Sequence, residues 1–128
     1  MKTEVGKKWV EALRGGEYLQ GMRALRIGMG TPENPFRYCC LGVLCELAVK
    51  AGAIAPATFD SASSQARYEN NPSYLPDQVM QWAGLDDSNP LVGERSLSYA
   101  NDKDKVSFDG IADLIEQHLI PKEESVAK

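Results

Sequence analysis

Residues 38–49, Tyr-Cys-Cys-Leu-Gly-Val-Leu-Cys-Glu-Leu-Ala-Val, form the most apolar stretch of the chain and contain one charged side chain, Glu46. Leu41, Leu44 and Ala48 recur at helical spacing. The neighbouring positions are apolar as well, so a helix here would be apolar around most of its circumference. Such a helix must be covered on several sides. We therefore expect the domain to be built around a central helix that ends near Gly52, a typical residue just beyond a helix C-terminus.

Gly42 lies inside this predicted helix. A glycine at an interior helical position costs about 1 kcal/mol relative to alanine. Its presence in an otherwise strong helix indicates that another segment of backbone crosses close to position 42. The central helix is thus expected to have a close backbone neighbour on this side.

The aromatic-Cys-Cys-Leu-Gly-x-Leu-Cys-acid-Leu pattern resembles the core of a group of small phage and prophage proteins, mostly uncharacterised. The resemblance extends to the blocks Trp9–Leu13, Leu75–Asp77 with Trp82–Leu85, Asn101-Asp102, and Ser107–Glu116, in that order. It implies a phage origin and no settled activity. Some classes of small phage proteins counter host defence by holding its signalling nucleotides, so an anti-defence role is one function that the resemblance implies.

The chain has 128 residues, 43% of them hydrophobic, which fits one modest core. We expect a single globular domain over residues 1–121 and a polar C-terminal tail over 122–128. No apolar run reaches the ~18 residues that span a bilayer. The first eight residues have no apolar signal-peptide core. These features predict a cytoplasmic protein, in the bacterial host if the phage resemblance holds, with no membrane partner.

Charge is distributed unevenly along the chain, whose formal net charge is −4. Residues 1–50 contain eight Lys and Arg against five Asp and Glu, whereas residues 51–128 contain six against thirteen. Binding along a nucleic-acid backbone depends on many cationic contacts, so the acidic balance argues against a long nucleic-acid partner. A small anionic ligand held by a few arginines remains compatible with it.

The remaining sequence predicts an α+β fold in which helices dominate. About four helices are expected around the central Cys-rich one. The first runs from about Glu4 to Arg14 with Thr3 as its cap, and the last begins after a Ser107 cap. A turn-rich segment at 28–35 separates two short extended stretches, which predicts a small antiparallel hairpin near residues 20–38. Residues 53–73 lack periodicity and are expected to form a long surface loop.

Four arginines flank the N-terminus of the central helix, a place that attracts anions. If Arg23 or Arg26 lies opposite Arg37 in the hairpin, their guanidinium groups can converge on a phosphate. Nearby aromatic side chains offer faces on which a base can stack. The predicted ligand-binding residues are Arg23, Arg26, Arg37, Tyr38, Arg14, Trp9 and Tyr18. The alternative is that these arginines are surface charges paired with Glu17, with Glu33 or with carboxylates of the acidic C-terminal half.

The three cysteines, Cys39, Cys40 and Cys45, are best explained as reduced core residues, because their number is odd and neighbours on a helix do not pair. A cysteine at the helix N-terminus can be nucleophilic, and His118, the only histidine, would have to be its base. The three thiols and His118 also make a zinc set by count, but their spacing opposes one. We therefore predict no catalytic residues, no metal and no cofactor.

Three functions follow from these observations. The first is a non-enzymatic binding protein that sequesters a small anionic, nucleotide-derived signalling molecule. The second is an inhibitor that docks on a host enzyme through an acidic surface of the C-terminal half. The third is a small cysteine-dependent hydrolase, which ranks last. The sequence leaves the oligomeric state open, and a homo-oligomer is among the states that it allows.

Overall fold

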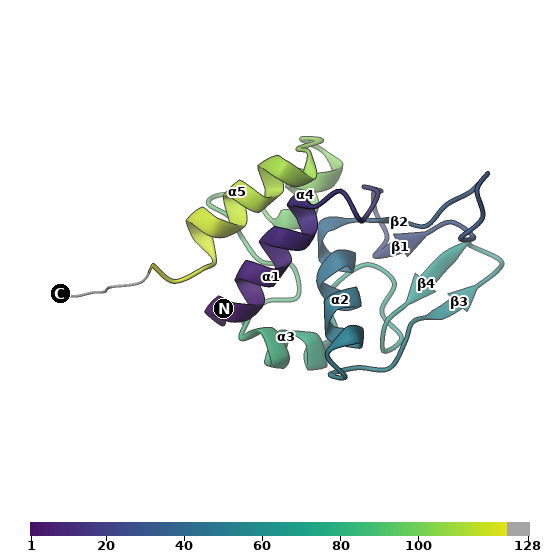
Figure 1. Ribbon diagram of the computed structural model, residues 1–128, viewed down its shortest axis with the longest axis horizontal. Coiled ribbons are helices and arrows are strands. Elements are labelled where there is room, and N and C mark those ends of the chain that lie inside the picture. The colour runs from purple at the N-terminus through teal and green to yellow at the C-terminus, as the bar shows by residue number, and fades with distance from the viewer. Residues whose placement is uncertain (123–128) are drawn as a thin grey trace.

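The computed structural model describes residues 1–122. These residues form a small α+β domain with five helices and a four-stranded antiparallel sheet (Figure 1). The elements follow the order α1 (Thr3–Arg14), β1 (Arg26–Ile27), β2 (Arg37–Tyr38), α2 (Cys40–Lys50), β3 (Thr58–Asp60), β4 (Gln65–Arg67), α3 (Asp77–Ala83), α4 (Leu97–Asp102) and α5 (Phe108–His118). In Figure 1 the helices lie on one side of the molecule and the sheet on the other, with α2 between them. No helix in the described part of the chain is long and apolar enough to cross a membrane.

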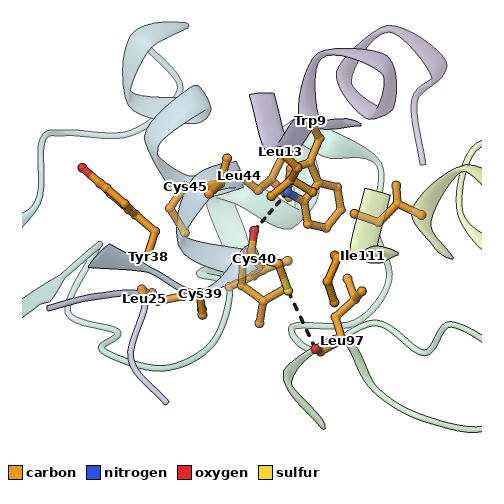
Figure 2. Packing of buried hydrophobic residues seen from close by; sticks show 14 of the residues in the cluster. Trp9, Leu13, Leu25, Tyr38, Cys39, Cys40, Leu44, Cys45, Leu97 and Ile111 are labelled. Atoms are coloured by element: carbon orange, nitrogen blue, oxygen red, sulfur yellow. Dashed lines mark hydrogen bonds between the residues drawn. The ribbon is translucent and has the colours of Figure 1, made fainter. Parts of the chain in front are cut away.

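The α2 helix is largely buried in the core. Seven of its residues are buried, and its sides contact α1, α3, α4 and β2. Figure 2 shows Leu44, Cys40 and Cys45 of α2 among side chains from α1, α4 and α5. The helix ends where the sequence predicts, because Ala51 is its C-cap residue and Gly52 adopts a left-handed conformation with φ of 78°. The prediction that this helix is buried is confirmed.

The sheet has the strand order β2-β1-β4-β3, and every pair is antiparallel. The predicted hairpin is present as β1 and β2, joined by the turn-rich segment 28–36. The outer edge of β2 is covered by residues 19–21, since the Gly21 N–H donates to the Tyr38 carbonyl at 2.7 Å and the Tyr38 N–H to that of Leu19 at 2.8 Å. The β3 strand forms the opposite edge of the sheet.

The predicted surface loop over 53–73 is wrong in part, because it contains β3 and β4. Neither strand has the apolar alternation that marks a strand in a sequence. Thr58–Asp60 faces solvent on most sides, and the pairing with Gln65–Arg67 depends on the tight turn between them. The sheet is therefore twice the size of the predicted hairpin.

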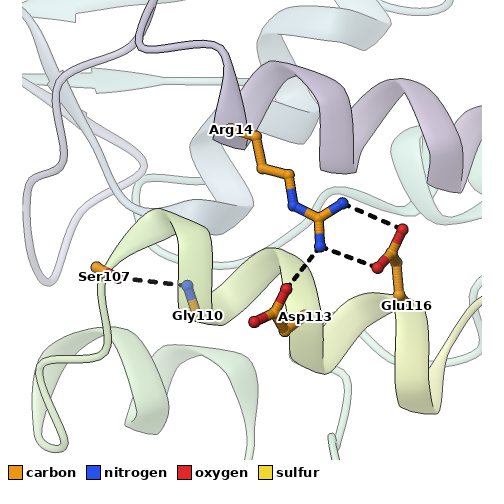
Figure 3. A network of polar contacts seen from close by, with 5 residues as sticks. All are labelled: Arg14, Ser107, Gly110, Asp113 and Glu116. Carbon is orange, nitrogen blue, oxygen red and sulfur yellow. Dashed lines mark hydrogen bonds and ion pairs between the residues drawn. The ribbon is translucent and has the colours of Figure 1, made fainter.

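Of the two predicted helix caps, one differs in the structure and one is present. Thr3 is the first residue of α1 rather than its cap, and Lys2 takes the cap position without a side-chain hydrogen bond. Ser107 does cap α5 as predicted, because its hydroxyl accepts a hydrogen bond from the Gly110 N–H at 3.3 Å (Figure 3). The predicted tail begins at Lys122, and its residues 123–128 lie outside the described part.

Candidate functional site

A row of cationic and aromatic side chains connects the C-terminal end of α2 with the β1–β2 hairpin. Its five members, which we call the cation–aromatic row, are Lys50, Tyr18, Tyr38, Arg26 and Phe36. The Lys50 ammonium donates to the Tyr18 hydroxyl at 2.8 Å, and the two tyrosine rings meet edge to face with centroids 5.1 Å apart. At the other end, the Arg26 guanidinium carbon lies 4.0 Å from the centre of the Phe36 ring. This geometry is a close cation–π contact.

Strand register explains why Arg26 and Tyr38 lie together. Arg26 is directly opposite Tyr38 in the β1–β2 ladder, and directly opposite residues of two antiparallel strands present their side chains on the same face. Phe36 precedes Tyr38 by two residues and therefore shares this face as well. The same face includes the buried Ala66 of β4, so it is the side of the sheet that packs toward the core.

A carboxylate accompanies this row. Glu46 of α2 accepts a hydrogen bond of 2.7 Å from the hydroxyl of Tyr68, a fully buried residue just after β4. Burial and the hydrogen bond to Glu46 raise the pKa of Tyr68 well above its ordinary value. Burial, together with the charge of Glu46, also raises the pKa of Tyr38, and the charge of Arg26 opposes that rise. Both phenols are therefore protonated at neutral pH.

Arg26 holds the one buried side-chain nitrogen or oxygen without a hydrogen-bond partner among residues 1–122, its Nε atom. Buried polar groups in native proteins are nearly always paired, and an unpaired one calls for a physical explanation. The cation–π contact with Phe36 holds the guanidinium group in place but gives the Nε–H no acceptor. An oxygen of an anionic ligand is one group that would satisfy it.

The other predicted arginines of the hairpin region do not join Arg26. Arg37 is directly opposite Ile27, so its side chain lies on the face of the hairpin that is opposite to that of Arg26. Arg23 lies in the exposed loop before β1, with a left-handed φ of 75°. Its backbone N–H donates a hydrogen bond to the Asp102 carboxylate of α4 at 3.0 Å. The expected convergence of two guanidinium groups across the hairpin is thus not found.

Arg14 and Trp9 of α1 also lie elsewhere. Figure 3 shows the Arg14 guanidinium between two carboxylates of α5, 2.6 Å from Asp113 and 2.9 Å from Glu116. These pairs match the alternative that some of the arginines are surface ion-pairing residues. Trp9 is fully buried, and its indole N–H donates to the Cys40 carbonyl at 3.0 Å (Figure 2). Trp9 therefore offers no free face for a ligand.

The cysteines are core residues with unreactive thiols. Cys39, Cys40 and Cys45 are all free and buried. Burial raises the pKa of Cys39 to about 11 and the pKa values of the other two well above the ordinary thiol value, although Cys39 is the N-cap residue of α2. The Cys40 thiol instead contacts the Leu97 carbonyl at 3.7 Å (Figure 2). A thiolate nucleophile is not favoured here.

His118 is exposed at the end of α5 and makes no hydrogen bond with any of these thiols in the described part of the chain. No group of three or more histidine, cysteine, aspartate or glutamate side chains within residues 1–122 is arranged to hold a metal ion. Neither the cysteine–histidine pair nor the zinc set is assembled by this fold.

Sequence reasoning missed four residues around Arg26. Phe36 and Lys50 complete the row, and Glu46 and Tyr68 form the adjacent hydrogen bond. Glu46 gave a usable signal, because it is the only charge in the apolar stretch and a half-buried carboxylate needs a partner. Nothing in the sequence indicated Tyr68, because its contact with α2 depends on the preceding strand β4, which has no recognisable sequence pattern.

Comparison with known proteins places this α+β domain, with its buried Cys-rich helix, in a defined family. A family model described as a domain of unknown function, DUF8296, matches residues 1–119. The chain belongs to this family. No curated protein and no solved structure matches it.

Proposed function

We propose that the domain is a non-enzymatic binding protein that sequesters a small anionic, nucleotide-derived signalling molecule. The observation that supports this most is the Arg26 guanidinium, half-buried over Phe36 with an Nε–H that no protein group accepts. A phosphate oxygen offers a charge-assisted hydrogen bond to this group, which is among the stronger polar contacts in proteins. Under the proposal the protein is a phage-type sponge that acts in the cytoplasm of a bacterial host.

The proposed site is smaller than the seven residues named from the sequence. Arg26 stays in it as the group that would contact the ligand, and Lys50 supplies a second cation at the far end of the row. Tyr38 and Tyr18 are buried core residues that join Arg26 to Lys50 rather than faces open to a ligand. Arg14 and Trp9 are not part of it, because the first is occupied by two carboxylates and the second is buried in the core. The half-buried ring of Phe36 offers an apolar edge for a base or ribose beside the phosphate.

Isothermal titration of the protein with cyclic dinucleotides and with ADP-ribose derivatives tests the proposal. We expect one of these ligands to bind and Arg26→Gln to weaken binding about 10- to 100-fold, the range that corresponds to one hydrogen bond with a charged group. Arg37→Gln is the matched control, because it removes the same charge from the other face of the same hairpin. Absence of heat with every ligand, at protein concentrations well above micromolar, would refute the proposal.

A further inference from the structure

The segment that connects α3 to α4 presents an apolar side chain on a well-ordered turn. The Val92 N–H donates to the Arg95 carbonyl at 2.8 Å, and the Leu97 N–H donates to the Pro90 carbonyl at 2.9 Å. Val92 is buried and anchors the turn. Leu91 beside it is 58% exposed, the highest value for a large apolar side chain among residues 1–122. The turn thus fixes Leu91 in a position that favours contact with another molecule.

Two shallow hollows meet at Leu91. One, of about 340 Å³, lies between Leu91, Arg95 and Tyr99, and the ring of Tyr99 is 43% exposed. The other, of about 260 Å³, lies between Leu91, Asp86 and Asp87. Aromatic side chains are enriched at protein interfaces, and here an exposed leucine and a half-exposed tyrosine line the same hollow.

The border of these hollows is acidic. Asp86, Asp87 and Glu94 line them, and none of the three makes an ion pair with a described residue. The nearby cation, Arg95, is balanced, because it lies 3.3 Å from Asp104 and 4.7 Å above the Tyr99 ring. The Met1 amino group borders the second hollow and donates to the Leu119 carbonyl at 3.3 Å. Carboxylates therefore outnumber the unbalanced cations around Leu91.

We infer that this region, which we call the Leu91 surface, docks a partner protein through a segment whose apolar side chains are bordered by lysine or arginine. The surface consists of Leu91, Tyr99, Arg95, Glu94, Asp86 and Asp87. Its apolar centre supplies the affinity, and its acidic border selects a basic partner and speeds encounter. It shares no residue with the cation–aromatic row, so docking is independent of the proposed ligand site.

Nuclear magnetic resonance titration of the ¹⁵N-labelled protein with three synthetic peptides of equal length tests this inference. The first is an amphipathic helix of leucine and lysine, the second has glutamate in place of lysine, and the third is oligolysine. We expect the leucine–lysine peptide to bind tightest and to shift the amide signals of Leu91, Glu94 and Tyr99 most. Equal binding of oligolysine, or shifts concentrated on other faces, would overturn the inference.

Variants distinguish specific binding at the Leu91 surface from non-specific binding to exposed apolar side chains. The double variant Leu91→Ser with Tyr99→Ser should reduce affinity for the leucine–lysine peptide by at least about tenfold, as for residues at the centre of an interface. Phe59→Ser is the control, since Phe59 is 42% exposed on β3 at the far edge of the sheet (Figure 1). All three side chains are exposed, so these variants should keep the wild-type melting temperature. Equal affinity of the double variant and the control would refute the inference.

Discussion

The α-carbon of Gly42 in α2 lies so close to the Leu25 carbonyl group that a Cβ atom at position 42 would overlap the Leu25 oxygen. The atoms in the way belong to backbone rather than to a flexible side chain. Leu25 immediately precedes β1, so this contact sets the distance between the central helix and the segment that leads to Arg26. The glycine in the apolar stretch is therefore explained by a close backbone neighbour, as its position in the sequence predicts.

Gly42→Ala should destabilise the domain by roughly 2 kcal/mol or more, because the strain of an overpacked core exceeds the gain of about 1 kcal/mol in helix propensity. Urea unfolding followed by circular dichroism measures the change. Gly110→Ala in α5 is the comparison, since a Cβ there would meet a side-chain methyl group of Val106 rather than a backbone carbonyl, and we expect a smaller loss of stability. A variant Gly42→Ala as stable as wild type would contradict the packing at Leu25.

The buried hydrogen bonds of Asn101 should also contribute to the stability of the domain. Asn101 is fully buried; its amide donates to the Gly21 carbonyl at 2.8 Å, and its oxygen accepts from the Gln20 amide at 2.9 Å. Asn101→Ala removes this donor from the Gly21 carbonyl and one of the two acceptors of the Gln20 amide, which keeps its hydrogen bond to the Val106 carbonyl. We therefore expect a loss of about 1–3 kcal/mol of unfolding free energy. Chemical denaturation measures this loss. A change within experimental error would mean that the 20–21 segment is not held by α4.

The cysteines should be inert in the folded protein. Burial and raised pKa values keep the thiols of Cys39, Cys40 and Cys45 protonated at pH 8. We expect the colorimetric thiol reagent DTNB to modify none of them in native protein and all three after unfolding in guanidinium. Rapid modification of Cys39 in the native state would instead show an accessible thiolate and would revive the hydrolase hypothesis.

The ion pairs between α1 and α5 should make a small, pH-dependent contribution. The hydrogen bond with Arg14 lowers the pKa of Glu116, so the stabilisation is present above the unfolded-state pKa of this carboxyl group and is lost as the pH falls through its lower folded-state value. The difference in melting temperature between wild type and Arg14→Gln should therefore begin to shrink as the pH falls below about 4.3, the ordinary pKa of a glutamate carboxyl group, and should vanish only below the lower folded-state pKa of Glu116. Because both side chains are exposed, it should also shrink in high salt. A difference that does not decrease as the pH falls through the titration range of the carboxyl groups would contradict this assignment.

The sequence predicted the features of the fold that nearby residues determine and missed those that tertiary contacts determine. Four predictions rest on short stretches of sequence, and the structure confirms them: the burial of α2, its end near Gly52, the close backbone neighbour of Gly42 and the Ser107 cap. The strands β3 and β4 escaped prediction because each is three residues long and has no apolar alternation. Short pairings of this kind are fixed by tertiary contacts.

The candidate site was predicted less well, because it depends on register and on distant partners. A shift of one residue in the β1–β2 pairing would move Arg26 to the face that Arg37 occupies, and the sequence does not fix that register. Likewise, the carboxylates that bind Arg14 are about a hundred residues away in the chain. Arg26 pairs with Tyr38 in the β1–β2 ladder and Tyr38 contacts Tyr18, whereas Lys50 and Phe36 join this group only through the tertiary structure.

The central claim is that the Arg26 Nε–H binds an anionic ligand, and the nuclear magnetic resonance signal of this group tests it most directly. The Nε–Hε resonances of the arginines can be followed while ADP-ribose or a cyclic dinucleotide is added, with Arg26→Lys and Arg37→Lys to assign them. We predict that the Arg26 signal moves downfield to saturation while the Arg37 signal stays in place. An Arg26 signal that does not move at saturating ligand, or that moves no more than that of Arg37, would contradict the claim.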